Sequence, residues 1–143
     1  RHGYASEFGF GVIDDPDKAI EPYDVSFHCS ASSKGLQLAI DLLAREGRVI
    51  ELSWYGVKAI ELSLGYDFHS LRKQIISSQV GSIPAHMARS WDTRRRKKTV
   101  FELLKNKLFD QHITHEVTLE EAASRFGEWR EKSPAGLGYV IKY

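Results

Sequence analysis

The stretch DVSFHCSASS at residues 24–33 decides the fold, together with GRVIELS at residues 47–53. Residues 24–29 are rich in β-branched and aromatic side chains, which predicts a strand, and the small hydroxylic residues after them predict a tight loop and a helix N-cap. Residues 48–53 predict a second strand. Strand, helix and strand joined by short connections predict a βαβ unit, whose two strands lie parallel with a right-handed crossover.

The helix between these two strands is predicted from the spacing of its apolar residues, and a glycine follows it. Helical spacing is seen for Leu36, Ala39, Ile40 and Leu43. Gly47 stands where a C-terminal glycine cap is expected.

Further elements are predicted on both sides of this unit. Residues 11–14 predict a strand closed by turn residues, and residues 74–80 predict another strand. A helix is expected over residues 86–106, with Val100, Phe101, Leu103 and Leu104 turned inward. Strands are expected at 113–117 and 138–143. Between them, Thr118-Leu119-Glu120-Glu121 has the spacing of a capping box, followed by an apolar stripe of Leu119, Ala122, Ala123 and Phe126.

Composition excludes several classes of function. The 143 residues carry 20 Lys and Arg against 19 Asp and Glu, a net charge of +1, which favours neither nucleic acid nor an acidic surface as a partner. No apolar run approaches the roughly 20 residues that span a bilayer, so no membrane partner is expected. The single cysteine, Cys29, forbids an internal disulfide and a thiolate zinc cluster, and it suits a reducing cytoplasm.

The basic run at residues 94–98 follows Trp91, a combination that can bind nucleic acid. On a helix, however, five consecutive residues point in all directions and form no single patch. The run is therefore interpreted as a solvated helix start, part of which faces a partner domain.

Small or hydroxylic residues follow the predicted strands, where ligands bind in open parallel sheets. The three strand ends read Cys29-Ser30-Ala31, Leu52-Ser53-Trp54 and Ser77-Ser78-Gln79. Such residues let a flat ligand lie close to the backbone, although serine is also common in turns. Their recurrence at three strand ends predicts a ligand-binding edge.

The sequence shows none of the common catalytic motifs. Gly9-Phe10-Gly11 and Gly136-Leu137-Gly138 precede strands and form no dinucleotide loop. No P-loop, Gly-x-Ser-x-Gly elbow or His-Glu-x-x-His motif occurs. His112 and His115 have no Cys or carboxylate partners at ligand spacing, so a structural role is expected. His28, within an apolar strand, is interpreted as a satisfied core or loop histidine rather than a base.

In their order and spacing, these segments resemble the C-terminal part of the medium-chain dehydrogenase/reductase superfamily, which contains the zinc-type alcohol dehydrogenases. Residues 4–10 resemble the helix end and glycine before the third Rossmann strand, and residues 24–31 resemble the fourth strand and its loop. Residues 47–53 resemble the fifth strand. Ile113-Thr114-His115 and Leu119-Glu120-Glu121-Ala122 resemble the return segment.

The resemblance implies an α/β fold: a partial Rossmann fold, made of the later strands of the doubly wound parallel sheet, plus a C-terminal segment that returns to a GroES-like catalytic domain. Residues 1–80 would be the C-terminal part of the NAD(P)-binding domain, and residues 81–143 the helix and strands that cross back. The parent enzyme would transfer a hydride between NAD or NADP and an alcohol or carbonyl substrate.

The resemblance also implies a cofactor site. The contacts would come from Arg1, Cys29, Ser30, Ala31, Leu52, Ser53, Trp54, Ser77 and Gln79. Two positions depart from the family pattern: Ser53 stands where glycine is usual, and Gly138 stands near the place of a pyrophosphate-binding arginine. The glycine-rich loop, the acidic ribose ligand and the zinc ligands would all lie upstream of Arg1, so zinc is expected only in the parent enzyme.

Three expectations follow. The start at Arg1, without an initiator Met or a signal peptide, is interpreted as a cut inside a longer protein, and no catalytic residue is assigned, so the chain should be inactive alone. Bare edges at the strands of residues 11–14 and 24–29 should prevent a stable monomer and favour a homo-oligomer joined through sheet edges, with residues 1–20 re-paired, swapped or disordered. Two other functions stay open: a non-catalytic nucleotide-binding module, and an interaction protein that uses the helix around residues 94–98.

Overall fold

The computed structural model describes residues 2–19, 22–132 and 136–143. The chain divides into two compact units, residues 1–82 and residues 83–143. Within the described part of the chain, no helix is long and apolar enough to cross a membrane.

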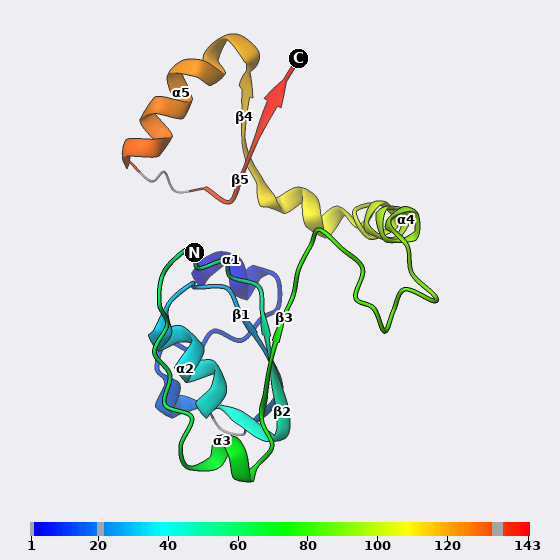
Figure 1. The fold of residues 1–143 in the computed structure, drawn as a ribbon. Coiled ribbons are helices and arrows are strands. Elements are labelled where there is room, and N and C mark those ends of the chain that lie inside the picture. The colour runs from blue at the N-terminus through cyan, green and yellow to red at the C-terminus, as the bar shows by residue number, and fades with distance from the viewer. Residues whose placement is uncertain (1, 20–21, 133–135) are drawn as a thin grey trace. The chain divides into compact units, whose positions relative to one another are not determined.

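A three-stranded parallel sheet forms the centre of the first unit (Figure 1). Its strands are β1 (Tyr23–His28), β2 (Leu43–Glu51) and β3 (Gln74–Ser77), in the order β1-β2-β3. Val25 pairs with Arg48, and Arg48 pairs with Gln74. The predicted order of three adjacent parallel strands is therefore confirmed, with β3 ending three residues earlier than expected.

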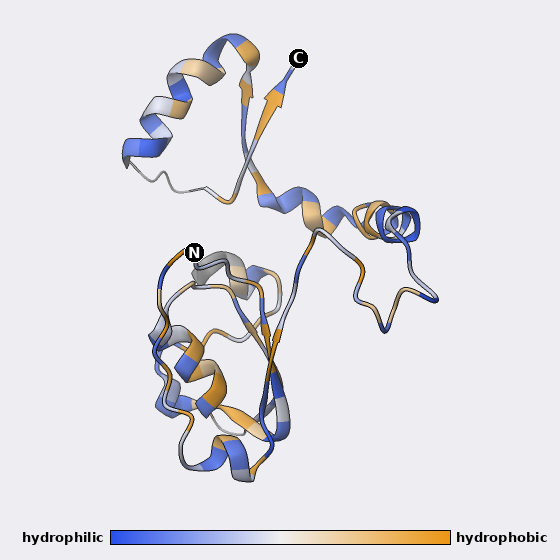
Figure 2. Ribbon diagram, in the orientation of Figure 1, coloured by the Kyte–Doolittle hydropathy of each residue, from blue (hydrophilic) through white to orange (hydrophobic). Residues whose placement is uncertain are grey.

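Helix α2 (Ser33–Asp41) crosses from β1 to β2 and supplies three of the five residues of the buried core cluster. The Ser32 side chain caps it by accepting from the Gly35 backbone N–H at 3.1 Å, as the hydroxylic loop predicts. Its apolar side, visible in Figure 2, contributes to a buried cluster with the strands. The cluster consists of Leu36, Ala39, Ile40, Leu43 and Val49.

The prediction that Gly47 caps this helix is wrong. Helix α2 ends at Asp41, and β2 begins two residues later, so Gly47 lies inside the strand. A Cβ atom there would stand 3.0 Å from the backbone oxygens of Ala44 and Tyr23. Glycine is therefore needed because neighbouring backbone approaches closely, and not because a helix ends.

The strand predicted at residues 11–14 is also wrong. Helix α1 (His2–Glu7) is followed by Gly9 in the left-handed region (φ 78°), which fits the helix end and glycine of the resemblance. Residues 10–13 then have no regular structure, and Phe10, Val12 and Ile13 are exposed. A strand requires a partner, and no described strand pairs with this segment. The short 3-10 helix η1 (Pro16–Lys18) and, further on, helix α3 (Asp67–Ser70) complete the unit.

In the second unit, helix α4 (Thr93–Leu103) is shorter than the helix predicted over residues 86–106. It begins late because the Asp92 side chain caps it by accepting from the Arg95 N–H at 2.6 Å. The inward orientation predicted for the apolar residues of this helix is wrong, since all four are exposed: Val100, Phe101, Leu103 and Leu104. The predicted solvated character of residues 94–98 agrees with their mostly exposed side chains.

The 3-10 helix η2 (Lys107–His112) leads to β4 (Ile113–Thr118), which pairs in parallel with β5 (Gly138–Lys142). Helix α5 (Leu119–Lys132) connects them. The predicted capping box is confirmed, because Thr118 Oγ1 accepts from the Glu121 N–H and the Glu121 carboxylate accepts from the Thr118 N–H. The predicted apolar stripe is only partly right: Ala122 is buried, whereas Leu119, Ala123 and Phe126 are exposed.

Candidate functional site

The C-terminal ends of β1 and β2 lie side by side, and a hydrogen bond joins the loops that follow them. The Ala31 backbone N–H donates to Ser53 Oγ at 3.0 Å. Ala31 has a positive φ of 49°, a strained conformation for a residue with a Cβ. Such strain persists only where surrounding contacts hold the backbone, and it often accompanies functional sites.

The residues predicted for the ligand edge occupy these loops and differ in exposure. Cys29 is an exposed free thiol, and Ser30 is exposed, whereas Ala31 and Ser53 are half-buried. Leu52 and Trp54 present apolar surface, and Trp54 is 89% exposed.

Strand β3 brings its own end to the same edge of the sheet. Ser77 is its last residue and pairs with Glu51, and the Ser78 N–H donates to the Glu51 backbone oxygen at 2.9 Å. The Gln79 side-chain oxygen accepts from the Gly81 N–H at 2.6 Å. The structure thus places the three predicted strand ends on neighbouring strands, with a side-chain link only between the first two. Arg1 lies outside the described residues.

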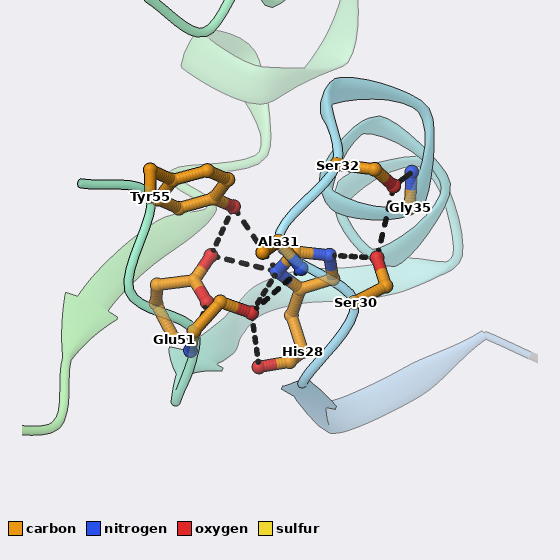
Figure 3. Close-up of polar contacts among 8 residues, drawn as sticks. His28, Ser30, Ala31, Ser32, Gly35, Glu51 and Tyr55 are labelled. Carbon is orange, nitrogen blue, oxygen red and sulfur yellow. Dashed lines mark hydrogen bonds and ion pairs between the residues drawn. The ribbon is translucent and has the colours of Figure 1, made fainter. Parts of the chain in front are cut away.

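A buried polar cluster at the ends of β1 and β2 was not predicted as a whole (Figure 3). His28 is 4% exposed, and its Nδ1 lies 2.7 Å from Glu51 Oε2. Its Nε2 lies 2.7 Å from Ser30 Oγ. The prediction that His28 is a histidine with satisfied hydrogen bonds is confirmed.

Sequence reasoning missed two members of this cluster, Glu51 and Tyr55. The Tyr55 hydroxyl donates to Glu51 Oε2 at 2.7 Å, and the Ser53 N–H donates to Glu51 Oε1 at 2.7 Å. One signal was available: a carboxylate within the apolar run of β2, next to a histidine at the end of the neighbouring strand. A buried charge requires partners, so the pair could have been sought.

The hydrogen bonds set the ionisation of Glu51 and Tyr55. Burial alone would raise the pKa of the Glu51 carboxyl, but hydrogen bonds from Tyr55, the Ser53 backbone and His28 outweigh it and hold this pKa below its ordinary value. Burial, then the hydrogen bond to Glu51 and the negative charge of that carboxylate, raise the pKa of Tyr55 to about 12. Glu51 is therefore a carboxylate, and Tyr55 a donor, throughout the neutral range.

The stability of the first unit should depend on pH at both extremes. The pKa of Glu51 is lower in the folded state, so its contribution is complete above the ordinary pKa of 4.5 and is lost as pH falls through the lowered folded value. The pKa of Tyr55 is higher in the folded state, so its contribution is complete below the ordinary value of 10.0 and is lost as pH rises through about 12. Urea denaturation at a series of pH values measures the contributions of both groups to the free energy of unfolding.

Glu51→Gln is the matched variant for this experiment, since it keeps the size of the side chain and removes the charge. The variant should lose the acid dependence that Glu51 contributes but only part of the alkaline dependence of Tyr55, because burial, the largest cause of the raised Tyr55 pKa, remains. If wild type and variant showed the same pH dependence of stability, that dependence would come from other groups.

No group of three His, Cys, Asp or Glu side chains that could hold a metal is found among residues 2–19, 22–132 and 136–143. His112 and His115 stack on aromatic rings instead, on Phe109 and Tyr139 respectively.

Comparison with known proteins yields solved structures only, since no family model and no curated relative matches the chain. A 2R,3R-butanediol dehydrogenase from Bacillus subtilis superposes with a TM-score of 0.77 at 16% identity, covering 99% of this chain and 40% of its own. An alcohol dehydrogenase from E. coli, complexed with NADH, gives 0.70 at 15% identity, covering 99% and 41%. A cobalt- and zinc-bound alcohol dehydrogenase from Pyrobaculum aerophilum gives 0.67 at 19% identity, covering 100% and 41%.

The chain therefore has the fold of a part of these dehydrogenases, a partial Rossmann sheet followed by a second α/β unit, and it spans about two-fifths of their length. The predicted fold class is confirmed.

Proposed function

We propose that this chain, which has a dehydrogenase fold, is part of an oxidoreductase. That enzyme would transfer a hydride between NAD or NADP and an alcohol or carbonyl substrate. The chain would supply one end of the cofactor site, and the fold likeness together with the edge of β1-β2-β3 supports this. The observation that carries the proposal is the bond from the Ala31 N–H to Ser53 Oγ. It holds two strand ends together at the side of a parallel sheet where ligands bind.

The edge fits the nicotinamide end of such a cofactor better than its pyrophosphate. Exposed Leu52 and Trp54 offer apolar surface to a flat ring, and small residues at 29–31 leave the backbone approachable. The chain has no glycine-rich loop before a helix, which is the usual seat of a pyrophosphate.

Each predicted contact has a role in this proposal. Cys29, Ser30 and Ala31, then Leu52, Ser53 and Trp54, would lie along the cofactor, and Ser77 and Gln79 would offer backbone groups to the carboxamide. The bound cofactor supplies the hydride chemistry, while the chain's own residues orient the ring and exclude water from one side of it. Arg1 remains a sequence prediction, and zinc would be held by residues outside this chain.

Nicotinamide mononucleotide tests the proposal directly, because it is the half of the cofactor that the edge fits. In NMR spectra of the 143-residue chain it should shift the backbone amides of residues 29–31 and 52–54. Adenosine monophosphate, the other half, should shift them much less. Trp54→Ala should weaken the response, whereas Trp91→Ala in the second unit should leave it unchanged. Shifts outside the β1-β2-β3 edge, or none at millimolar ligand, would contradict the proposal.

The chain alone should not oxidise alcohols with either nicotinamide cofactor, with or without added zinc. A metal that polarises the substrate oxygen contributes several kcal/mol to transition-state stabilisation, and its ligands would lie elsewhere. The absorbance of the reduced cofactor is the measurement, and turnover by the chain would assign a catalytic site to it.

We also propose that the chain forms a homo-oligomer through its sheet. β1 is an edge strand of the described sheet, and alternate residues along it are exposed and aromatic or β-branched: Tyr23, Val25 and Phe27. Unpaired strand edges with apolar side chains recruit further chains. Light scattering at micromolar concentration tests this, and a monodisperse monomer would contradict it.

A further inference from the structure

Both ring nitrogens of His28 contact a neighbouring side chain, Glu51 on one side and Ser30 on the other (Figure 3). The Glu51 carboxylate can only accept, so the 2.7 Å contact places a proton on His28 Nδ1. In a neutral imidazole the other nitrogen, Nε2, is then an acceptor. The contact at 2.7 Å from Nε2 to Ser30 Oγ is therefore a bond that the Ser30 hydroxyl donates.

A second hydroxyl completes the environment of Ser30. Ser32 Oγ accepts from the Gly35 N–H at 3.1 Å and lies 2.9 Å from Ser30 Oγ. Because Ser32 has its own proton to give, Ser30 Oγ receives one hydrogen bond from Ser32 and donates one to His28. The proton of Ser30 thus points at a base, as in a serine nucleophile.

The base and the nucleophile of this arrangement differ in exposure, as a nucleophilic site requires. His28 and Glu51 are buried, whereas Ser30 is exposed. Gly35 packs directly over the contact: a Cβ at this position would stand 2.2 Å from Ser30 Oγ and 2.9 Å from His28 Nε2. Only glycine leaves the two groups in their observed places.

We propose that Ser30 is an activated nucleophile that accepts acyl groups from small activated esters. His28 acts as the general base, and Glu51 is the positioning residue that holds the tautomer and orientation of the imidazole. The Tyr55 hydroxyl and the Ser53 N–H fix the carboxylate in turn. This activity is separate from the cofactor role proposed above and needs no cofactor.

The reaction proceeds in two steps, acylation of Ser30 and hydrolysis of the acyl group. Ser30 Oγ attacks the ester carbonyl carbon while its proton passes to His28 Nε2; the bond to the alcohol oxygen then breaks, and the alcohol leaves with that proton. Water next attacks the acyl group, passes a proton to His28, and releases the acid as the proton returns to Ser30. The N–H groups of Ser33 and Lys34, in the first turn of α2, have no acceptor within the helix and are candidates to bind the negative oxygen.

A fluorophosphonate probe tests this without any variant, because Ser30 can be compared with another exposed serine of the same molecule. The probe forms a phosphonyl-serine ester and releases fluoride. Peptide mass spectrometry of the labelled 143-residue chain should find Ser30 modified at least about 100-fold faster than Ser70, the factor typical of general base catalysis. Modification of Cys29 or Tyr55 in place of Ser30, or equal rates at Ser30 and Ser70, would overturn the proposal.

Variants then separate the roles, with circular dichroism as a check that each is folded. Ser30→Ala should abolish the label at this site, and His28→Gln should slow the labelling of Ser30 about 100-fold. Gly35→Ala retains every reacting group but parts Ser30 from His28, so it should slow labelling by a similar factor. Ser70→Ala is the control and should leave the Ser30 rate unchanged.

Glu51→Gln distinguishes a positioning residue from a merely structural one. It should slow the labelling of Ser30 and leave the rate at Ser70 unchanged, whereas Glu51→Asp, which keeps the carboxylate, should restore part of the Ser30 rate. An unchanged Ser30 rate in a folded Glu51→Gln chain, or no recovery in Glu51→Asp, would remove Glu51 from the proposed mechanism, and unchanged labelling in folded His28→Gln would overturn the proposal as a whole.

Discussion

Replacing Glu51 with leucine is expected to lower the free energy of unfolding of the first unit by about 3–5 kcal/mol. The substitution removes the acceptor of three donors at once: His28 Nδ1–H, the Tyr55 hydroxyl and the Ser53 N–H. Each buried donor left without a partner costs about 1–3 kcal/mol, and leucine offers no compensating bond.

Native-state hydrogen exchange at the Val49 amide, at the centre of β2, measures this loss within the first unit alone. Glu61→Leu is the matched control, because Glu61 is an exposed glutamate of the same unit, and it should change the free energy of unfolding by less than about 0.5 kcal/mol. A loss below about 1 kcal/mol for Glu51→Leu would mean that the three donors find other acceptors.

Ile40→Ala should be nearly as damaging, with an expected loss of about 2–5 kcal/mol. Ile40 is 1% exposed and belongs to a core cluster of only five buried residues. Deleting its side chain removes apolar burial and leaves a cavity, and the close-packed surroundings relax only in part. Among the described residues of the unit, no second buried cluster compensates for this loss.

Leu38→Ala, on the same helix, is the control for this prediction. Leu38 is 38% exposed, so its truncation should cost less than about 1 kcal/mol. Urea denaturation followed by far-ultraviolet circular dichroism compares the two variants. Equal losses would indicate that α2 contributes through helix formation rather than through its buried face.

Sequence pattern reports local tendencies, so it predicts contacts within one element better than contacts between elements. The capping box at Thr118 and Glu121 was predictable, since both partners lie within one helical turn. The strand at residues 11–14 was not, because pairing depends on whether another strand is within reach. Helix α4 shows the same limit: its apolar residues could be counted, but their exposure depends on what packs against them.

The sequence by itself determined the parallel order of β1, β2 and β3, because short connections through a helix leave little choice of topology. It also determined that small and hydroxylic residues stand at the strand ends, including Ser30 and Ser53. Only the tertiary structure decided that His28 meets Glu51, 23 residues later in the chain, because the parallel register of β1 and β2 sets those two residues opposite each other. The same register brings Ser53 Oγ to the Ala31 N–H. No local pattern encodes it, since it results from packing both strands against one core.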